Sequence, residues 1–150
     1  MEFPITELLD YERSVEWLIE HFHPGGFRCP DCKAPVETAR EFRQTKCSQL
    51  TVYRCRCGTA YNLYTGTVFQ QRHLNPRQAV LFMRGVCKGE PTRILAAELG
   101  LDYKMALQLR HDIQANAERL QPDTALPDQQ TETDEMFQNA GEKRAGTSRP

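Results

Sequence analysis

Four cysteines in two close pairs are the residues whose type and spacing point most directly to chemistry. Cys29 and Cys32 are separated by two residues, and Cys55 and Cys57 by one. A tight turn within such a pair lets both thiolates face one ion, and Zn²⁺ takes four soft ligands in a tetrahedron. We therefore predict that these four sulphurs bind one structural zinc ion.

The single-residue gap in the second pair leaves other ligand sets open. Cys47, His21 and His23 are the side chains that would replace one of the four cysteines. Reduced structural thiols or a redox pair are the alternatives to metal, but a redox pair is typical of a βαβ pattern, which is not visible here. A catalytic zinc would keep an open position beside acid and base groups, and the neighbouring residues indicate neither. Cys87 lies on the apolar face of a predicted helix and is predicted to be core.

A second functional pattern runs from Leu95 to Leu109. Ala96 is small, as helices that cross closely require, and Gly100 follows four residues later in a predicted turn. This spacing is typical of a helix-turn-helix, whose second helix presents its early residues to DNA bases while flanking Lys and Arg bind phosphates. For Lys104 and Gln108 an ordinary solvated helix face is the alternative. The predicted DNA-binding residues are Tyr103, Lys104, Gln108, Arg110, His111, Arg54 and Arg56.

The charge distribution fits a polyanionic partner. Residues 1–24 carry six acidic side chains and one basic side chain, whereas residues 25–120 carry fifteen Lys and Arg against eight Asp and Glu. Residues 121–150 are acidic again, with six acidic and three basic side chains. A basic middle segment gains affinity for DNA by displacing counterions from phosphates, although a solvated basic surface is the alternative.

Hydrophobic periodicity predicts the elements that position these residues. Apolar residues at steps of three and four predict a helix from about Thr6 to Phe22. Three short β-prone segments lie between the cysteine pairs and turn residues, and none is long enough to bury a core without a metal. These predicted strands are Val36–Phe42, Leu50–Arg54 and Ala60–Tyr64.

Three helices are predicted after the segment that contains the two cysteine pairs. Asn75 is the expected N-cap of the first, with Pro76 at its first position, and Lys88-Gly89 is its expected end. Thr92 and Asp102 are the expected N-caps of the second and third, and the third runs to about Leu120. The predicted fold is α+β, with an N-terminal helix (1–26), a zinc ribbon (27–70), a helix-turn-helix region (71–120) and a mostly disordered tail (121–150).

From the sequence we expect neither a signal peptide nor a membrane-spanning segment. The longest apolar run, from Ala79 to Met83, is far too short to cross a bilayer. We therefore expect a cytoplasmic protein without a membrane partner, in a reducing compartment where paired cysteines bind metal.

The order of these parts resembles the N-terminal region of bacterial insertion-sequence transposases that carry a zinc ribbon before a DDE-type, RNase H-like catalytic domain. The likeness covers roughly residues 14–120 and includes the Leu95–Leu109 helices at about the distance expected in that family. The resemblance implies that the ribbon and helices recognise terminal inverted repeats in double-stranded DNA, and that a following domain cuts and joins DNA. The segments that carry it are Gly26–Cys32, Tyr53–Cys57 and Thr65–Phe69.

The likeness extends into the C-terminal segment. Thr131–Phe137 resembles the first strand of the family's catalytic domain, so Asp134 would match the first carboxylate that binds Mg²⁺ in a complete member. Two-metal chemistry needs several carboxylates from separate strands, and the sequence ends at Pro150. We therefore expect a truncated transposase, or a fragment, that binds DNA without a complete catalytic domain and whose partners include a full-length transposase or a second copy. A transcription regulator and a zinc-stabilised protein-interaction module are the alternatives.

Overall fold

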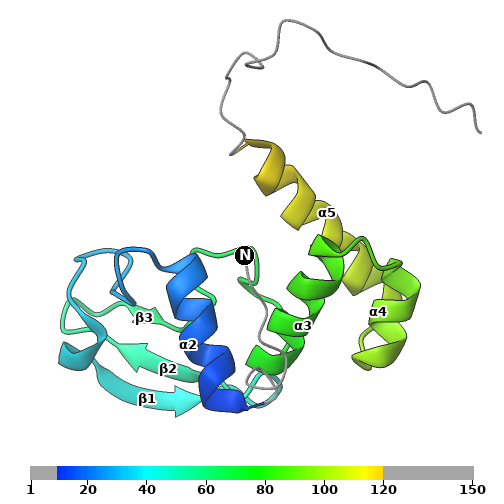
Figure 1. Cartoon of the computed structure of the whole chain (residues 1–150). Helices are drawn as coiled ribbons and strands as arrows, with labels where there is room; N and C mark the ends of the chain where they lie inside the picture. The colour runs from blue at the N-terminus through cyan, green and yellow to red at the C-terminus, as the bar shows by residue number, and fades with distance from the viewer. Residues whose placement is uncertain (1–9, 120–150) are drawn as a thin grey trace, which may run out of the picture.

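The computed structural model of the protein describes residues 10–119 and has an α+β fold, as predicted. A three-stranded sheet lies on one side of the molecule and helices α4 and α5 lie on the other, with helix α3 between them (Figure 1). Within the described range, no helix is long and apolar enough to cross a membrane. The elements in chain order are α2 (Tyr11–Phe22), η1 (Val36–Thr38), β1 (Arg40–Gln44), β2 (Thr51–Arg54), β3 (Ala60–Tyr61), α3 (Pro76–Cys87), α4 (Thr92–Glu98) and α5 (Tyr103–Arg119).

Helix α2 begins five residues later than the apolar periodicity predicts. Asp10 has an extended backbone and is the N-cap, because its carboxylate accepts hydrogen bonds from the backbone N–H groups of Glu12 and Arg13. Periodicity identifies the buried face of a helix but not the residue that satisfies its first N–H groups. The predicted start at Thr6 lies outside the described residues, as do the predicted tail and Asp134.

The sheet is antiparallel with strand order β1-β2-β3, so β1 is an edge strand. The predicted first strand began at Val36, but residues Val36–Thr38 form a single 3₁₀ turn after Pro35 and the strand starts at Arg40. The predicted third strand ends early, because the Asn62 side chain accepts a hydrogen bond from the Tyr64 N–H and turns the chain. Short strands and Asx turns compete for the same residues here, which is why the boundaries differ.

Helix α3 starts as predicted and ends as predicted. Asn75 and Gln78 form a reciprocal capping box, with Pro76 at the first helical position. At the other end, Gly89 has a φ of 73°, and the N–H of the following residue bonds back to the Gly85 carbonyl. These local interactions explain why the boundaries of this helix could be predicted from sequence.

Cys87 is exposed and does not belong to the core, contrary to the prediction. The last turn of α3 packs on α4 through Gly85, where a Cβ atom would lie 2.2 Å from a methyl carbon of Leu95. Cys87 is two residues from Gly85 and therefore about 200° around the helix axis. The close approach of α4 decides which side of this turn is buried, so Cys87 faces away.

The caps of the last two helices differ from each other. Asp102 caps α5 as predicted, because its carboxylate accepts a hydrogen bond from the Met105 N–H at 3.0 Å. Thr92 was predicted to cap α4, but it is the first helical residue and Pro91 occupies the N-cap position without a side-chain hydrogen bond. The Thr92 hydroxyl instead accepts a hydrogen bond from Arg110 of α5 at 2.7 Å. A tertiary partner has replaced the local capping role.

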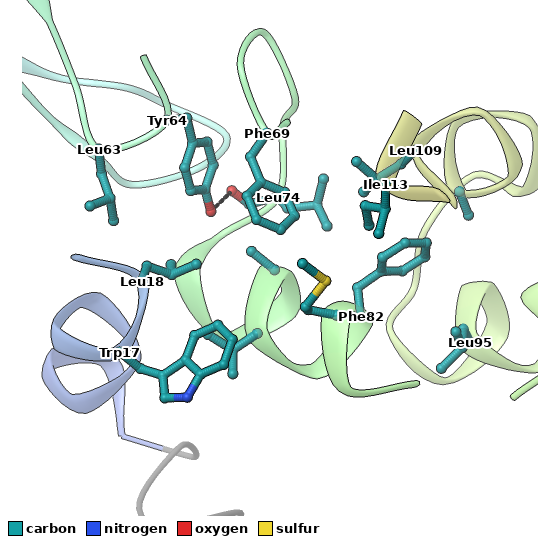
Figure 2. Packing of buried hydrophobic residues seen from close by; sticks show 14 of the residues in the cluster. Trp17, Leu18, Leu63, Tyr64, Phe69, Leu74, Phe82, Leu95, Leu109 and Ile113 are labelled. Atoms are coloured by element: carbon teal, nitrogen blue, oxygen red, sulfur yellow. Dashed lines mark hydrogen bonds between the residues drawn. The ribbon is translucent and has the colours of Figure 1, made fainter. Parts of the chain in front are cut away.

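One hydrophobic core joins α2, the segment after β3 and the three C-terminal helices (Figure 2). Phe69 is fully buried at its centre and makes an edge contact with Phe22, with ring centroids 5.3 Å apart. The buried Tyr64 hydroxyl donates to the Leu74 carbonyl at 3.0 Å, which satisfies both polar groups. The segment from Thr65 to Phe69 therefore anchors the sheet to the helices.

Candidate metal centre

The four predicted zinc ligands converge on one point. The sulphurs of Cys29, Cys32, Cys55 and Cys57 all lie within 4.8 Å of one another. Cys29 Sγ is 3.6 Å from Cys57 Sγ, and Cys32 Sγ is 3.3 Å from Cys55 Sγ. Within residues 10–119 no other group of His, Cys, Asp and Glu comes together in this way.

The spacing of the sulphurs fits a tetrahedral ion better than disulfides. Metal–sulphur bonds of about 2.3 Å at tetrahedral angles place ligand sulphurs roughly 3.8 Å apart. Disulfide sulphurs lie at about 2.0 Å, and all six cysteines of the chain are free thiols. The four-cysteine set can therefore hold one metal ion.

The two cysteine pairs are presented by nearly equivalent turns despite their different gaps. The Cys29 N–H bonds to the Ala34 carbonyl, and the Cys55 N–H bonds to the Thr59 carbonyl, each at 2.9 Å. Each turn contains one residue with positive φ directly after its second cysteine, Lys33 at 61° and Gly58 at 100°. The second turn closes with one residue fewer and still directs both sulphurs inward, so the short gap does not remove a ligand.

Contacts within each turn shift the pKa values of the cysteine thiols. The Thr59 hydroxyl and backbone N–H both contact the Cys57 sulphur and lower the pKa of Cys57 to about 6. The Ala34 N–H likewise lowers the pKa of Cys32, but hydrogen bonds with the other three sulphurs outweigh it and raise that pKa to about 12. Four thiols this close cannot all ionise without a cation among them, and a divalent metal supplies that charge.

A contact between the two turns was missed by the sequence analysis. The Thr59 hydroxyl donates to the Asp31 carboxylate at 2.5 Å, and Asp31 lies between Cys29 and Cys32. The same hydroxyl oxygen is 3.3 Å from Cys57 Sγ. This bond connects the two turns directly, as outer-shell partners of metal ligands commonly do. An Asp inside one cysteine pair and a Thr after the other were its only signal in the sequence.

The alternative ligands are engaged elsewhere. His21 Nδ1 lies 2.9 Å from the Trp17 carbonyl and its ring stacks on that indole, while His23 Nε2 lies 2.8 Å from the Leu63 carbonyl. Cys47 is exposed in the turn between β1 and β2, and β2 separates it from Cys55 by four residues, which is roughly 13 Å of strand. The four-cysteine set is therefore the one that the fold brings together.

The four-cysteine cluster (Cys29, Cys32, Cys55 and Cys57) has its own small hydrophobic core. Cys29 and Cys55 are buried with Tyr61, and the rings of Phe27, Tyr53 and Tyr61 contact one another with centroids 5.4 to 6.1 Å apart. This cluster contains too few apolar side chains to order the ribbon without a further constraint. A structural metal is the constraint that these sulphurs can provide.

The predicted DNA-binding residues of α5 fall into two groups. Tyr103, Lys104 and His111 are exposed, and Lys104 lies about 200° around the helix from the fully buried Ala106. Gln108 and Arg110 have hydrogen-bond partners within the protein: the exposed Gln108 donates through Nε2 to Asp112 at 3.0 Å, and the half-buried Arg110 bonds to Thr92. Their predicted role in DNA binding would require them to leave these partners.

Arg54 and Arg56, the predicted DNA-binding residues of the ribbon, are both exposed. Arg54 ends β2 directly before Cys55, and Arg56 lies between the two cysteines of the second pair. A metal held by the four cysteines would therefore fix the backbone that carries both side chains. Comparison with protein-family models, curated proteins and solved structures finds no match to this chain.

Proposed function

We propose that the protein binds double-stranded DNA, with a structural zinc ion ordering the ribbon and with α5 as the recognition helix. The observation that carries the proposal is the division of α5 into two faces. Ala106, Leu109 and Ile113 are buried in the core, while Lys104 and His111 are exposed on the opposite side. A helix held rigidly by one face can insert the other face into the major groove.

The zinc ion fits the proposal as a structural element. The four thiolates would fill all four coordination positions, which leaves no open position for a water or substrate. Its contribution is to hold the backbone at Arg54 and Arg56, whose guanidinium groups are suited to phosphate binding.

The transposon-end version of this function rests on the resemblance of the Gly26–Cys32, Tyr53–Cys57 and Thr65–Phe69 segments to the family's ribbon. In that version the DNA sites are terminal inverted repeats. The Asp134 carboxylate would be the first of the family's metal-binding acids, and a complete member would use Mg²⁺ there. A full-length transposase or a second copy of the chain is the proposed protein partner.

To test the proposal, the zinc-loaded full chain is incubated with a random duplex library that also contains the sequences flanking the gene. The bound duplexes are identified at several salt concentrations. The expected result is enrichment of an inverted-repeat end, with affinity falling steeply as salt rises. Sites at promoters away from inverted repeats would overturn transposon-end recognition in favour of a transcription regulator. Loss of all binding even at low salt would overturn DNA binding itself.

A matched pair of variants tests the role of α5. Lys104→Ala and Lys88→Ala each remove one exposed positive charge, but Lys88 lies at the end of α3. We expect Lys104→Ala to weaken duplex binding and to reduce the slope of log affinity against log salt by about 0.9, the value for one phosphate contact. Equal effects of the two variants would overturn the assignment of α5 as the recognition helix.

A zinc-stabilised protein-interaction module is the second candidate, and one observation favours it. A groove of about 390 Å³ lies between α2 and β2, with apolar walls that include Val15, Ile19 and Tyr53 and with Glu12 and Glu16 at α2. This chemistry suits a basic, partly apolar peptide rather than DNA. DNA binding that does not weaken as salt rises, or the absence of DNA binding, would favour this candidate.

A further inference from the structure

We propose that the outer face of the β1–β2 hairpin also binds unpaired nucleotides by stacking a base on Phe42, on a surface that shares Arg54 and Arg56 with the proposed duplex contacts. The inference rests on the proposed function only in taking nucleic acid as the ligand. Its substrate is different, because a stacking platform needs a base whose face is not already covered by its neighbours in a duplex.

Phe42 is placed for contact with a ligand rather than for the core. Its side chain is 49% exposed in the middle of β1, in a strand that is exposed along its whole length. The strand register passes from the pair Glu41–Tyr53 to the pair Arg43–Val52, so Phe42 has no cross-strand partner. A bulge of this kind redirects a side chain and is common beside functional sites.

One arginine lies over the ring, and a second is the cross-strand partner of the first. The Arg54 guanidinium carbon lies 5.5 Å from the Phe42 ring centroid, and Arg40 is the cross-strand partner of Arg54. An arginine plane beside an aromatic ring extends the surface on which a base can stack. We define the hairpin arginines as Arg40, Arg43, Arg54 and Arg56.

The hairpin arginines are available for phosphates. All four are exposed, and the ion pairs among residues 10–119 involve Arg13, Arg72 and Arg84 instead. A hollow of about 390 Å³ beside Cys55 is lined by three of the hairpin arginines together with Thr38 and Ala39, without an acidic side chain. Unpaired guanidinium groups around a hollow are suited to a backbone phosphate next to the stacked base.

The charge of β1 argues against a second copy of the chain as the occupant. An edge strand with a free row of backbone groups can pair with another strand, and basic side chains on that edge oppose such pairing. In an antiparallel β1–β1 contact centred between Glu41 and Phe42, Arg40 of each copy would lie opposite Arg43 of the other. A polyanion, in contrast, is attracted by the same residues.

The test measures binding of the zinc-loaded full chain to a labelled thymidine oligonucleotide and to a duplex of equal length, by fluorescence anisotropy. We expect Phe42→Ala to weaken oligonucleotide binding about tenfold, the loss that follows from one base–aromatic stack, and to leave duplex binding unchanged. Phe42→Tyr should restore the stack and the affinity. Ile94→Ala is the matched control, because Ile94 is an apolar side chain of equal exposure, 49%, on α4.

Each result decides the proposal. Wild-type oligonucleotide binding by Phe42→Ala, or an equal loss for the oligonucleotide and the duplex, would overturn it. A change in sedimentation of Phe42→Ala relative to wild type, without a change in oligonucleotide binding, would overturn it in favour of self-association. The zinc content of Phe42→Ala must equal that of wild type, so that a lost ribbon is not mistaken for a lost stack. Because Lys104→Ala reports on duplex binding alone, failure of the α5 proposal leaves this result interpretable.

Discussion

The ribbon and the helical region both carry many arginines, but in the helical region half of the described ones, three of six, form ion pairs or hydrogen bonds with other side chains of the protein. Arg72 pairs with Asp112, Arg84 pairs with Glu90, and Arg110 bonds to Thr92. None of the hairpin arginines forms an ion pair with a residue in the range 10–119. Net charge counts both kinds equally, whereas only uncommitted arginines are available to a polyanion without loss of a structural contact.

The same two regions are stabilised in different ways. The C-terminal helices belong to the large core, to which the ribbon contributes Leu50, Leu63, Tyr64 and Phe69, whereas the part of the ribbon around the four cysteines has only a small group of aromatic side chains. A region without a large core needs a metal or another cross-link to fold. A metal held by the four cysteines would allow the ribbon to expose all of β1, because burial of β1 would then not be needed for its stability.

Removal of the metal should give the largest difference in stability between the two regions. Structural zinc contributes about 10–16 kcal/mol of apparent folding free energy in small zinc domains. We expect a chelator, or Cys29→Ser, to abolish amide protection in β1 and β2 while the far-UV circular dichroism of the helices largely persists. The control is Cys87→Ser, which removes an exposed thiol outside the cluster. Simultaneous loss of both signals would show that the shared core cannot hold the helices without the ribbon.

A cavity in the core of the helical region should destabilise the helices without changing zinc binding by the ribbon. Leu109 is fully buried, and Leu109→Ala should lower the free energy of unfolding by about 2–5 kcal/mol. We expect zinc affinity, measured by competition with a chromophoric chelator, to stay unchanged. Leu107→Ala on the same helix is the control, since Leu107 is partly exposed. A parallel fall in zinc affinity would contradict the separation of the two regions.

Overfilling the α3–α4 contact tests the same region with a smaller change. A Cβ at Gly85 would lie 2.2 Å from Leu95 Cδ2, while a Cβ at Gly25 would meet no atom within 4 Å. We expect Gly85→Ala to destabilise the protein by about 1–3 kcal/mol despite the better helix propensity of alanine. Gly25→Ala should leave the midpoint of chemical denaturation unchanged, and an unchanged midpoint for both variants would contradict a tight α3–α4 contact.

The smallest expected effect on stability concerns the arginines that form ion pairs within the protein. Arg72 and Asp112 are about one quarter and one third exposed, so a double-mutant cycle should give a coupling free energy of at most about 1 kcal/mol. The Arg13–Glu16 pair is far more exposed, at 61% and 65%, and should couple more weakly. A larger coupling at the exposed pair would remove burial as the explanation of the difference.

Sequence reasoning succeeded where a structure is decided by neighbours along the chain. The Asn75 and Asp102 caps and the glycine that ends α3 involve atoms within a few residues of each other, so their residue types predict them. The two cysteine pairs are equally local, and their turns place the sulphurs in pairs before the fold joins them.

Sequence reasoning failed where distant residues compete with local ones. Thr92 has the residue type of an N-cap, yet Arg110, eighteen positions later, takes its hydroxyl. Cys87 has the periodicity of a core residue, but the approach of Leu95 to Gly85 sets the buried side of its turn.

The sequence by itself therefore determined the fold class, the four cysteines that converge to a site able to hold a metal ion, and the helices that follow them. These features follow from periodicity, turn chemistry and ligand spacing, which act over short stretches of chain. Only the tertiary structure decided which basic side chains remain free. Ion pairs and hydrogen bonds such as Arg72–Asp112 and Arg110–Thr92 form between elements that packing brings together, and residue type alone does not specify that packing.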